Sequence, residues 1–360
     1  MSDKHDLASL RQQIDAVDQQ LHQLLNQRAQ LAQEVGHTKI KLGDPVFYRP
    51  EREADVLRAV QARNQGPIGN EEIARLFREI MSVCLSLEMP MNIAYLGPAG
   101  TYTQAAALKQ FGHSVKTHPV NAIDEIFREV ESGNCHYGVV PVENSTEGMV
   151  NQTLDMFMRS PLVICGEIEL RVEHHLISQE NELKAIKKIY SHQQSFAQCR
   201  EWLSANMFGV QCEVVNSNGE AAKLASEQTG TAAIAGETAA QIYQLNSLVK
   251  NIEDEPINTT RFLVIGKRLS GPSGQDKTSL MLSARNRPGA LLHLLEPFSK
   301  RNISMTKIES RPSRKGMWDY VFFVDIEGHA EEEPVKSALT EIEQEAALYK
   351  LLGAYPRKVF

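Results

Sequence analysis

Polar side chains that could bind a small molecule and exchange protons with it follow directly on an apolar run in mid-chain. The run is Tyr137–Val142, and the polar residues after it are Glu143, Asn144, Ser145 and Thr146. This pattern is typical of open α/β sheets, which bind ligands beyond the carboxyl ends of their strands. A plain connection between a strand and a helix would look the same, so this loop alone leaves both interpretations open.

A second polar cluster favours a binding site. Thr259, Thr260 and Arg261 lead into the apolar run 262–265, so hydroxyls and a cation stand beside another strand. A glycine-containing turn also separates the expected strand 92–96 from a helix at 104–111, where backbone N–H groups can approach an anion. That turn lacks the lysine of a nucleotide-binding loop. ATP and GTP are therefore not expected, and a bare tight turn remains the alternative.

Charged side chains also stand where the helical pattern of the first 90 residues requires apolar ones. Arg28 interrupts an apolar series with 3–4 spacing, and Glu88 lies on the apolar face of a later helix. A buried charge is costly without a partner, which leaves two interpretations of Arg28. It could pair with a carboxylate across a dimer, or belong to an anion site inside a helical bundle. Arg11 and Lys39 lie beside the same series and support the anion site.

The apolar series predicts the first element of the chain. Its members are Leu7, Leu10, Ile14, Val17, Leu21, Leu24, Leu31 and Val35. No proline occurs between Leu7 and Lys41, so one helix could run about 50 Å at 1.5 Å per residue. A compact region of about 90 residues has a radius of gyration of ~12 Å, so we expect the helix to pack against a second copy in an intertwined dimer. Pro50 opens a second helix and Asn70 a third.

Strands and helices then alternate, which predicts an α/β region of two lobes. We expect helices at 104–111, 124–131 and 220–228, and strands at 137–142, 162–166, 189–191, 213–217, 232–234 and 261–265. A further strand run is expected at 169–178. His174 and His175 are adjacent on that run and face opposite sides. They cannot share a metal, and we interpret at least one of them as a core residue.

The C-terminal region has the βαββαβ order of a ferredoxin-like fold. Its strands are expected at 278–284, 303–309, 320–326 and near 349, and its helices at 290–300 and from about 332. A flexible connector, Ser270–Gly274, precedes it. The predicted fold class is therefore multidomain, with an all-helical domain at 1–90, a two-lobed α/β domain at 92–268 and a ferredoxin-like α+β domain at 277–357.

Composition excludes several classes of protein. The 360 residues carry a net charge of −7, whereas a nucleic-acid-binding surface needs a basic excess. The first ten residues lack a signal-peptide core, and no run is long enough to span a bilayer. We expect a cytoplasmic protein that binds neither nucleic acid nor membrane. The five cysteines are scattered without a CxxC pair, which indicates free, mostly buried thiols and no metal site.

Residues 1 to about 90 resemble the all-helical chorismate mutases. The resemblance implies that Arg28, together with Arg11 of a second subunit, binds the substrate carboxylates. Lys39 would donate to the ether oxygen, and Glu53, supported by Arg52, would accept from the ring hydroxyl. The rearrangement needs no nucleophile, metal or cofactor, because the catalyst only has to hold the folded substrate and stabilise developing charge.

Three positions depart from one branch of that family. Cys84 replaces a serine, Glu88 a glutamine and Arg49 an acidic residue, and we assign all three to the substrate site. A glutamine can donate a hydrogen bond to the ether oxygen at any pH, whereas a glutamate can do so only when protonated. We therefore expect mutase activity to fall as pH rises through the titration of Glu88.

Residues 92–268 resemble the catalytic domain of prephenate dehydratases, which shares the two-lobed architecture of solute-binding proteins. The motifs GPAGTYT, YGVVPVENSTEG, SHQQSFAQC and TTRF carry the resemblance in that order. It implies loss of water and carbon dioxide from prephenate, with Thr260 as proton donor to the leaving hydroxyl. Glu143 or Asn144 would polarise that threonine.

The same resemblance implies a set of substrate-binding residues around the catalytic ones. The set consists of Ser145, Thr146, Ser191, Gln198 and Arg261. Ser191 and Gln198 would hold the substrate from the other lobe. Arg261 could pair with a substrate carboxylate or merely anchor its own strand.

Residues 277–357 resemble the ACT regulatory domains that bind amino acids. The segments Gly289-Ala290-Leu291-Leu292 and Glu309-Ser310-Arg311-Pro312 match the phenylalanine-binding motifs of that family. Glycine at a helix start exposes N–H groups to an amino-acid carboxylate. A domain that serves only dimerisation is the alternative.

Together the three regions resemble the bifunctional chorismate mutase–prephenate dehydratases that L-phenylalanine inhibits. The resemblance implies chorismate and prephenate as substrates, no cofactor, and a homodimer or higher homo-oligomer. Two rivals remain. One is a binding protein that holds its ligand without turnover, and the other is a dehydratase whose helical region only dimerises.

Overall fold

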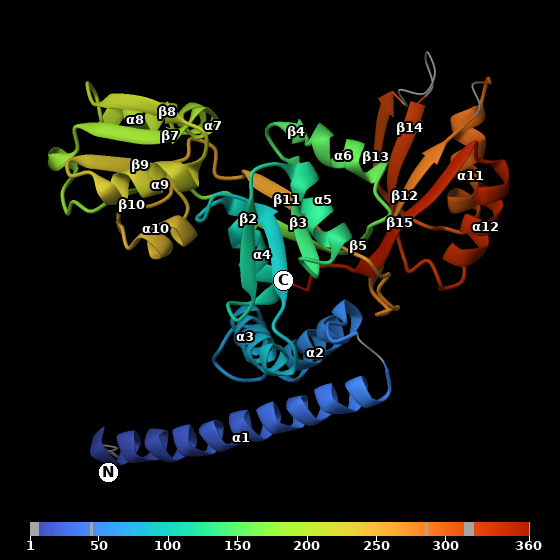
Figure 1. Ribbon diagram of the computed structural model, residues 1–360, viewed down its shortest axis with the longest axis horizontal. Helices are drawn as coiled ribbons and strands as arrows, with labels where there is room; N and C mark the ends of the chain where they lie inside the picture. Colours follow the sequence, from blue (N-terminus) through green and yellow to red (C-terminus); the bar gives the residue numbers. More distant parts are fainter. Residues whose placement is uncertain (1–6, 44–45, 285–286, 313–319, 360) are drawn as a thin grey trace, which may run out of the picture.

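The computed structural model describes residues 7–43, 46–284, 287–312 and 320–359. Figure 1 shows a long N-terminal helix, two shorter helices above it, two α/β lobes at the centre and left, and a sheet with two helices at the right. This arrangement confirms the predicted fold class. All five cysteines are free and four are buried, as predicted. No helix in the described ranges is long and apolar enough to cross a bilayer.

The helical region contains α1 (Leu7–Lys41), α2 (Pro50–Arg63) and α3 (Asn70–Glu88), and each begins at the predicted residue. Within the described part of α1, Gly36 is the only buried residue. A Cβ there would lie 3.2 Å from the Cβ of Glu88, so glycine permits the close approach of α1 to α3. The apolar series of α1 is otherwise uncovered, with Val17 60% and Leu24 62% exposed.

The first lobe is a sheet of order β2-β1-β3-β11-β5, with β4 beside β3. Its strands are β1 (Asn92–Leu96), β2 (Lys116–Val120), β3 (Tyr137–Asn144), β4 (Gly148–Met149), β5 (Val163–Arg171) and β11 (Thr259–Gly266). The first three are parallel, whereas β11 is antiparallel to β3 and β5. Helix α4 (Tyr102–Phe111) packs on one face of the sheet, and α5 (Ile123–Ser132) and α6 (Asn151–Phe157) pack on the other.

The second lobe is a sheet of order β10-β6-β9-β7-β8. Its strands are β6 (His175–Ser178), β7 (Lys188–His192), β8 (Gln211–Val215), β9 (Thr231–Ala235) and β10 (Asn246–Val249). Its helices are η1 (Leu183–Ala185), α7 (Gln193–Gln198), α8 (Arg200–Asn206), α9 (Asn218–Glu227) and α10 (Glu237–Tyr243). The predicted strand run 169–178 is wrong in its middle. Its two halves belong to different sheets, and the chain crosses between the lobes at 172–174.

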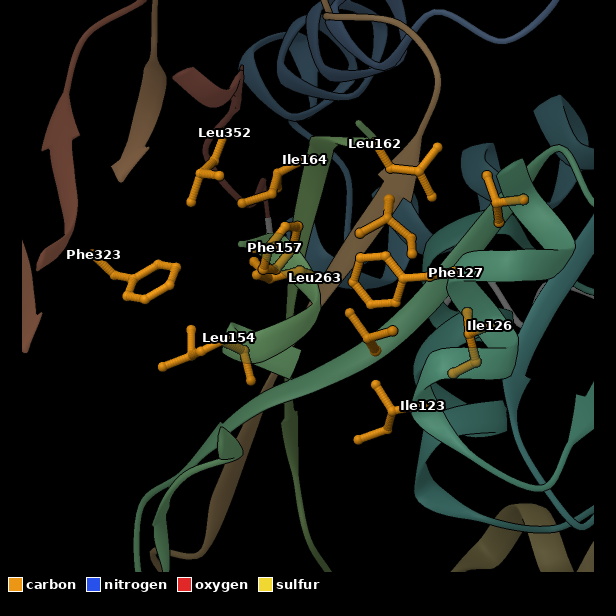
Figure 2. Packing of buried hydrophobic residues seen from close by; sticks show 14 of the residues in the cluster. Ile123, Ile126, Phe127, Leu154, Phe157, Leu162, Ile164, Leu263, Phe323 and Leu352 are labelled. Atoms are coloured by element: carbon orange, nitrogen blue, oxygen red, sulfur yellow. The ribbon is translucent and has the colours of Figure 1, made fainter. Parts of the chain in front are cut away.

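The C-terminal domain is an antiparallel sheet of order β13-β14-β12-β15. Its elements are β12 (Asp276–Ser283), α11 (Ala290–Lys300), β13 (Met305–Pro312), β14 (Tyr320–Glu327), α12 (Val335–Glu345) and β15 (Leu348–Pro356). Its two helices cover one face. The other face packs on the first lobe, where Phe323 and Leu352 meet Leu154, Phe157 and Ile164 (Figure 2). Strand β15 approaches β5 so closely that a Cβ on Gly353 would collide with the backbone oxygen of Ile164.

The segment 270–274, predicted to be a flexible connector, is held by hydrogen bonds. The guanidinium of Arg58 on α2 donates to the backbone oxygens of Ser273 (2.9 Å) and Gln275 (3.0 Å). Ser270 is buried as well. The prediction rested on glycine, serine and proline content, which contains no information about a partner on a distant helix.

Candidate active sites

A cleft of about 680 Å³ lies between the two lobes of the α/β region. Its lining comes mostly from the carboxyl ends of parallel strands. Residues between 96 and 103 follow β1, Asn144 ends β3, residues between 192 and 198 follow β7, and residues between 216 and 223 follow β8. This is the position at which open α/β sheets bind their ligands.

Asn144 and Thr260 form an oriented pair in this cleft. Strand β3 runs two residues beyond its predicted end, and its register with β11 places Asn144 opposite Thr260. Asn144 Nδ2 donates to Thr260 Oγ1 (2.8 Å) and to Asn258 Oδ1 (2.9 Å). Asn144 Oδ1 accepts from the backbone N–H groups of Thr146 (3.0 Å) and Glu147 (3.1 Å), which fixes the amide. Because Thr260 Oγ1 accepts from the amide, its own proton is available to a ligand.

Glu143 and Arg261 lie on the opposite face of the same two strands. Side chains alternate along a strand, so the residues next to the oriented pair point away from the cleft. Glu143 pairs with Lys307 of the C-terminal domain, and Arg261 Nη1 lies 2.7 Å from Asp325 Oδ2. Of the two candidates for polarising Thr260, the structure therefore places Asn144 against its hydroxyl and Glu143 on the opposite face. Of the two alternatives for Arg261, it places the residue as an anchor of its strand.

His174 links the two lobes beside the oriented pair. Its Nε2 lies 2.8 Å from Gln198 Oε1 of α7, and its Nδ1 lies 2.8 Å from the hydroxyl of Tyr102 on α4. Asn258 Nδ2 also donates to Gln198 Oε1 (3.1 Å), so that oxygen is an acceptor and the imidazole proton belongs on Nε2. Burial lowers the pKa of His174, and the hydrogen bond to Gln198 partly opposes this shift. The imidazole is therefore neutral at pH 7.

Other predicted residues support the cleft from behind. Ser191 is buried, and its Oγ lies 3.1 Å from Asn218 Oδ1, so it holds the start of α9. Thr146 Oγ1 donates to Asn144 Oδ1 (2.6 Å). Ser145 Oγ lies 3.0 Å from the backbone N–H that begins β11 and accepts its hydrogen bond. These two hydroxyls order the loop after β3.

Sequence reasoning missed several residues of the cleft. Among them are Tyr102, His174, Lys223 and Asn258. Tyr102 lies within the GPAGTYT motif and Asn258 directly precedes the TTRF motif. Their places in or beside these motifs could therefore have identified both as candidate cleft residues. At least one of His174 and His175 was interpreted as a core residue, and both are buried. His175 Nδ1 accepts from a backbone N–H, whereas His174 also lines the cleft. Lys223 is the only lysine or arginine among the described residues that line the cleft.

A second cluster of charges lies where α1 meets α3. Lys39 Nζ is 3.6 Å from Glu88 Oε2 and donates to the backbone oxygen of Phe47 (3.1 Å). Glu88 Oε2 is buried and has no hydrogen-bond partner in the part of the chain that the structure describes. Burial raises the pKa of Glu88, and the positive charges of Lys39 and Arg28 partly offset the rise. A buried carboxyl with an open acceptor position is suited to contact a ligand.

Several residues predicted for this cluster lie outside it within one chain. Arg11, Arg49 and Arg52 are exposed. Arg11 and Lys39 stand 28 residues apart on one helix, which is about 42 Å at 1.5 Å per residue. One substrate cannot contact both within a single chain. The predicted contribution of Arg11 therefore requires a second copy of α1.

Glu53 and Cys84, also predicted for this cluster, are both enclosed by the protein. Cys84 is buried on α3. Glu53 Oε1 lies 3.0 Å from Arg78 Nε. Burial raises the pKa of Glu53, and the charge of Arg78 lowers it in part. The same guanidinium donates to the backbone oxygen of Lys109 on α4 (3.1 Å), so Glu53 is tied to the contact between the helical region and the first lobe.

The first predicted effector segment begins helix α11. Gly289 has φ +78° at the N-cap, a conformation that glycine adopts without strain. A cavity of about 180 Å³ lies beside it. Its lining consists of Ala284, Arg287, Ala290, His293, Leu294, Gln344, Glu345 and Ala346. Leu291 and Leu292 are exposed instead.

The second predicted effector segment lies on the edge strand β13. Ser310 and Leu282 both pair with Phe322 of β14, so at a strand spacing of ~4.8 Å the second segment lies two strand spacings from the end of β12, the strand that precedes the first segment. Ser310 and Pro312 are exposed, whereas Glu309 and Arg311 share the half-buried face. Arg311 Nη2 lies 3.1 Å from Asp155 Oδ1 of α6.

Comparison with known proteins places three family models along the chain. Chorismate mutase type II matches residues 10–89, prephenate dehydratase residues 93–270 and the ACT domain residues 278–344. A protein of Stutzerimonas stutzeri named bifunctional chorismate mutase/prephenate dehydratase is 53% identical over 364 residues, covering 100% of both chains.

Two solved structures resemble the larger part of the chain. Prephenate dehydratase from Arthrobacter aurescens in complex with L-Phe is 30% identical, with a TM-score of 0.67, over 74% of this chain and 90% of that chain. A protein described as GqqA, a novel type of quorum quenching acylase, is 29% identical, with a TM-score of 0.69, over 75% of this chain and 99% of that chain.

We predict that His174 makes stability depend on pH. Its folded-state pKa lies below the ordinary value of 6.5, so just below pH 6.5 the unfolded chain binds a proton that the folded chain does not. The contribution of His174 to stability is therefore present at pH 7 and is lost as pH falls. In urea denaturation, the difference in unfolding free energy between wild type and His174→Gln should shrink from pH 7 to pH 5. A constant difference would contradict the assignment, and the matched change at the exposed His118 is the control.

Proposed function

This chain belongs to the bifunctional chorismate mutase/prephenate dehydratases, and on that premise we propose which of its residues carry each reaction. It rearranges chorismate to prephenate, converts prephenate to phenylpyruvate and is inhibited by L-phenylalanine. We assign the mutase to residues 1–90, the dehydratase to 92–268 and effector binding to 277–357.

The hydrogen bond between Asn144 and Thr260 is the observation that carries the dehydratase assignment. Thr260 gives its hydroxyl proton to the ring hydroxyl of prephenate as the C–O bond breaks, while the amide of Asn144 stabilises the charge that grows on Oγ1. The electrons of the bond to the ring carboxylate enter the ring, so carbon dioxide and water leave together and the ring becomes aromatic. Solvent then returns the proton to Thr260.

The remaining cleft residues suit a substrate with two carboxylates. Lys223 and the N-terminus of α9 can bind the carboxylate of the side chain, because backbone N–H groups at a helix start attract anions. We place the ring carboxylate beside Val172, an apolar residue of the lining, where loss of hydration favours its release as carbon dioxide. Neutral His174 and Gln198 close the cleft between the lobes without adding a charge.

Thr260→Ala should abolish most dehydratase turnover, because the leaving hydroxyl loses its proton donor. We expect kcat for phenylpyruvate formation from prephenate to fall by about 10²–10⁴-fold, with Thr260→Ser retaining most of it. Chorismate turnover by the same protein is the control for folding. A wild-type rate in Thr260→Ala would show that Thr260 is not the proton donor. If the wild-type protein forms no phenylpyruvate from prephenate, it is a binding protein that does not turn its ligand over. Production that ignores added L-phenylalanine would separate the C-terminal domain from its effector.

For the mutase, we propose that Lys39 and protonated Glu88 donate hydrogen bonds to the ether oxygen of chorismate and that Arg28 binds a carboxylate. Glu88 Oε2 is buried, has no hydrogen-bond partner among the described residues and lies 3.6 Å from Lys39 Nζ, which supports this assignment. The raised pKa of Glu88 extends the pH range over which its acid form exists. Arg52 and Glu53 remain candidates for the ring hydroxyl, although Glu53 pairs with Arg78 in this chain.

Mutase activity should therefore fall as pH rises through the titration of Glu88. Glu88→Gln should flatten this pH profile, because an amide donates its hydrogen bond at every pH. Chorismate disappearance is measured from pH 5 to 9, with the dehydratase profile of the same variant as the control. A profile that keeps its shape in Glu88→Gln would show that another group titrates.

We propose further that the mutase site is completed by a second copy of the chain. The apolar series of α1 is exposed along most of its length, and such a series is buried when two helices pair. Pairing of two copies would also bring Arg11 of the partner subunit to the cluster at Lys39 and Glu88. The dimer thus accounts for both the uncovered apolar surface and the distance between Arg11 and Lys39.

Leu21→Asp should abolish mutase activity and leave dehydratase turnover largely intact, because a charge in the apolar series opposes the pairing of α1 helices. Analytical ultracentrifugation and assays of both reactions measure the effect. Gln19→Asp, on the other side of the same helix, is the matched control. Full mutase activity in a protein that sediments as a monomer would refute the shared site.

A further inference from the structure

On each of the two strands that carry the oriented pair, the residue next to the pair member points toward the C-terminal domain. On β3, Asn144 faces the cleft and Glu143 faces away, and on β11 the same holds for Thr260 and Arg261. Adjacent residues share a peptide unit, so an anchor on one side chain restricts the direction of the next. Whatever holds Glu143 and Arg261 therefore also orients the groups proposed for catalysis.

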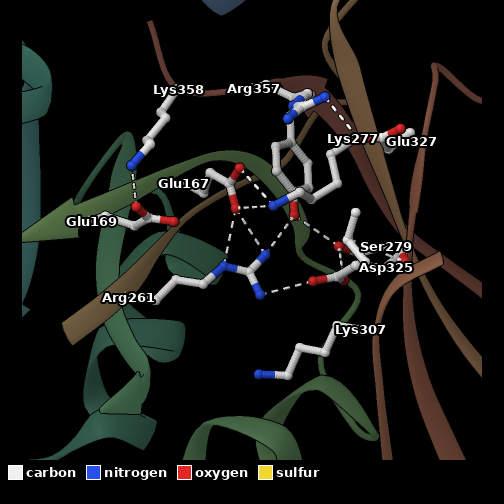
Figure 3. A network of polar contacts seen from close by, with 12 residues as sticks. Glu167, Glu169, Arg261, Lys277, Ser279, Lys307, Asp325, Glu327, Arg357 and Lys358 are labelled. Carbon is white, nitrogen blue, oxygen red and sulfur yellow. Dashed lines mark hydrogen bonds and ion pairs between the residues drawn. The ribbon is translucent and has the colours of Figure 1, made fainter. Parts of the chain in front are cut away.

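Arg261 is held by carboxylates from both domains. Its Nη2 lies 2.9 Å from Glu167 Oε2 of β5, and its Nη1 lies 2.7 Å from Asp325 Oδ2 of β14. Lys277 of β12 approaches the same oxygen of Glu167 at 2.7 Å. Figure 3 shows the guanidinium between the two carboxylates. The side chains of Arg261, Glu167, Asp325 and Lys277 are all 13% exposed or less.

Glu143 is held by Lys307 of β13. The ammonium of Lys307 forms an ion pair with Glu143 and lies 3.0 Å from the sulfur of Met149 on β4. Four residues further along β13, Arg311 donates to Asn151 Oδ1 of α6 (2.8 Å). Two side chains on the same face of one edge strand thus attach the C-terminal domain beside the end of β3.

The charges of this interface are complementary between the domains. The first lobe contributes two carboxylates, Glu143 and Glu167, and one guanidinium, Arg261. The C-terminal domain contributes two ammonium groups, Lys277 and Lys307, and one carboxylate, Asp325. Glu143 is 39% exposed, whereas Arg261, Glu167, Asp325 and Lys277 are buried, and removing one of these four leaves an uncompensated charge. The set therefore specifies one docked arrangement.

We propose that Lys307 and Asp325 are positioning residues for the dehydration of prephenate, acting through Glu143 and Arg261 on the Asn144–Thr260 hydrogen bond. This inference rests on the dehydratase function proposed above and assigns part of its machinery to the C-terminal domain. Among the described residues, the polar contacts of Lys307 are with Glu143 and Met149, neither of which lines the cleft, so its loss changes the geometry of the reacting groups and not the contacts of the bound substrate. The effector segment 309–312 continues directly from Lys307 on β13, so a ligand there would act on the same contact.

The test measures kcat and KM for prephenate in seven variants of the full-length protein. Lys307→Met should lower kcat by about 10- to 100-fold, the usual cost of a displacement near 1 Å, with KM changed less than about threefold. Asp325→Asn should show the same split. Lys307→Arg should restore the wild-type rate, and the exchange Glu143→Lys with Lys307→Glu should recover activity that each single change loses. Lys336→Met, a change at an exposed position on α12, is the matched control.

Mutase turnover by each variant reports whether the protein has folded. A wild-type kcat in both Lys307→Met and Asp325→Asn would overturn the inference while leaving the proposed function in place. A rise in KM at constant kcat would also overturn it, because that result means that Lys307 contributes to substrate binding. Absence of phenylpyruvate from the wild-type protein would overturn the proposed function and this inference together.

Discussion

The antiparallel pairing of β3 with β11 is the constraint on which the cleft and the docked C-terminal domain both depend. It places Asn144 opposite Thr260 and Glu143 opposite Arg261. A slip of one residue would exchange the two faces of a strand. The apolar residues alone would tolerate a slip, because β11 is buried on both sides, with Leu263 in one core and Phe262 in the other. The penalty comes from Arg261, which would lose both carboxylates inside the protein.

Where the C-terminal domain meets the first lobe, apolar contacts favour association and charged contacts fix the orientation. Phe323 and Leu352 bury apolar surface against Leu154 and Phe157, which favours association but is nearly indifferent to orientation. The ion pairs around Glu167 and Asp325 have specific partners and directions. A buried ion network adds little net stability compared with apolar packing. Its effect here is that only one orientation of the two sheets satisfies every charge.

The amino-acid sequence alone determined much of the fold. The 3–4 spacing of apolar residues defined α1 from Leu7 to Lys41, because a helix must present one continuous apolar face. Alternating strands and helices predicted the two lobes, and the βαββαβ order predicted the C-terminal domain. The amino-acid sequence also placed Asn144 and Thr260 at the ends of strands. These features depend on local periodicity and turn chemistry, which are legible in neighbouring residues.

Only the tertiary structure decided which of these residues work together. The sequence did not distinguish Glu143 from Asn144 as the partner of Thr260, because the choice depends on the register between strands 115 residues apart. His174 and Asn258 belong to the cleft because each forms a hydrogen bond with Gln198 of the other lobe. Arg261 is an anchor of its strand because it forms an ion pair with Asp325 of another domain. Local pattern determines which face of a strand a side chain occupies. What lies on that face is set by long-range packing, which no short segment of sequence contains.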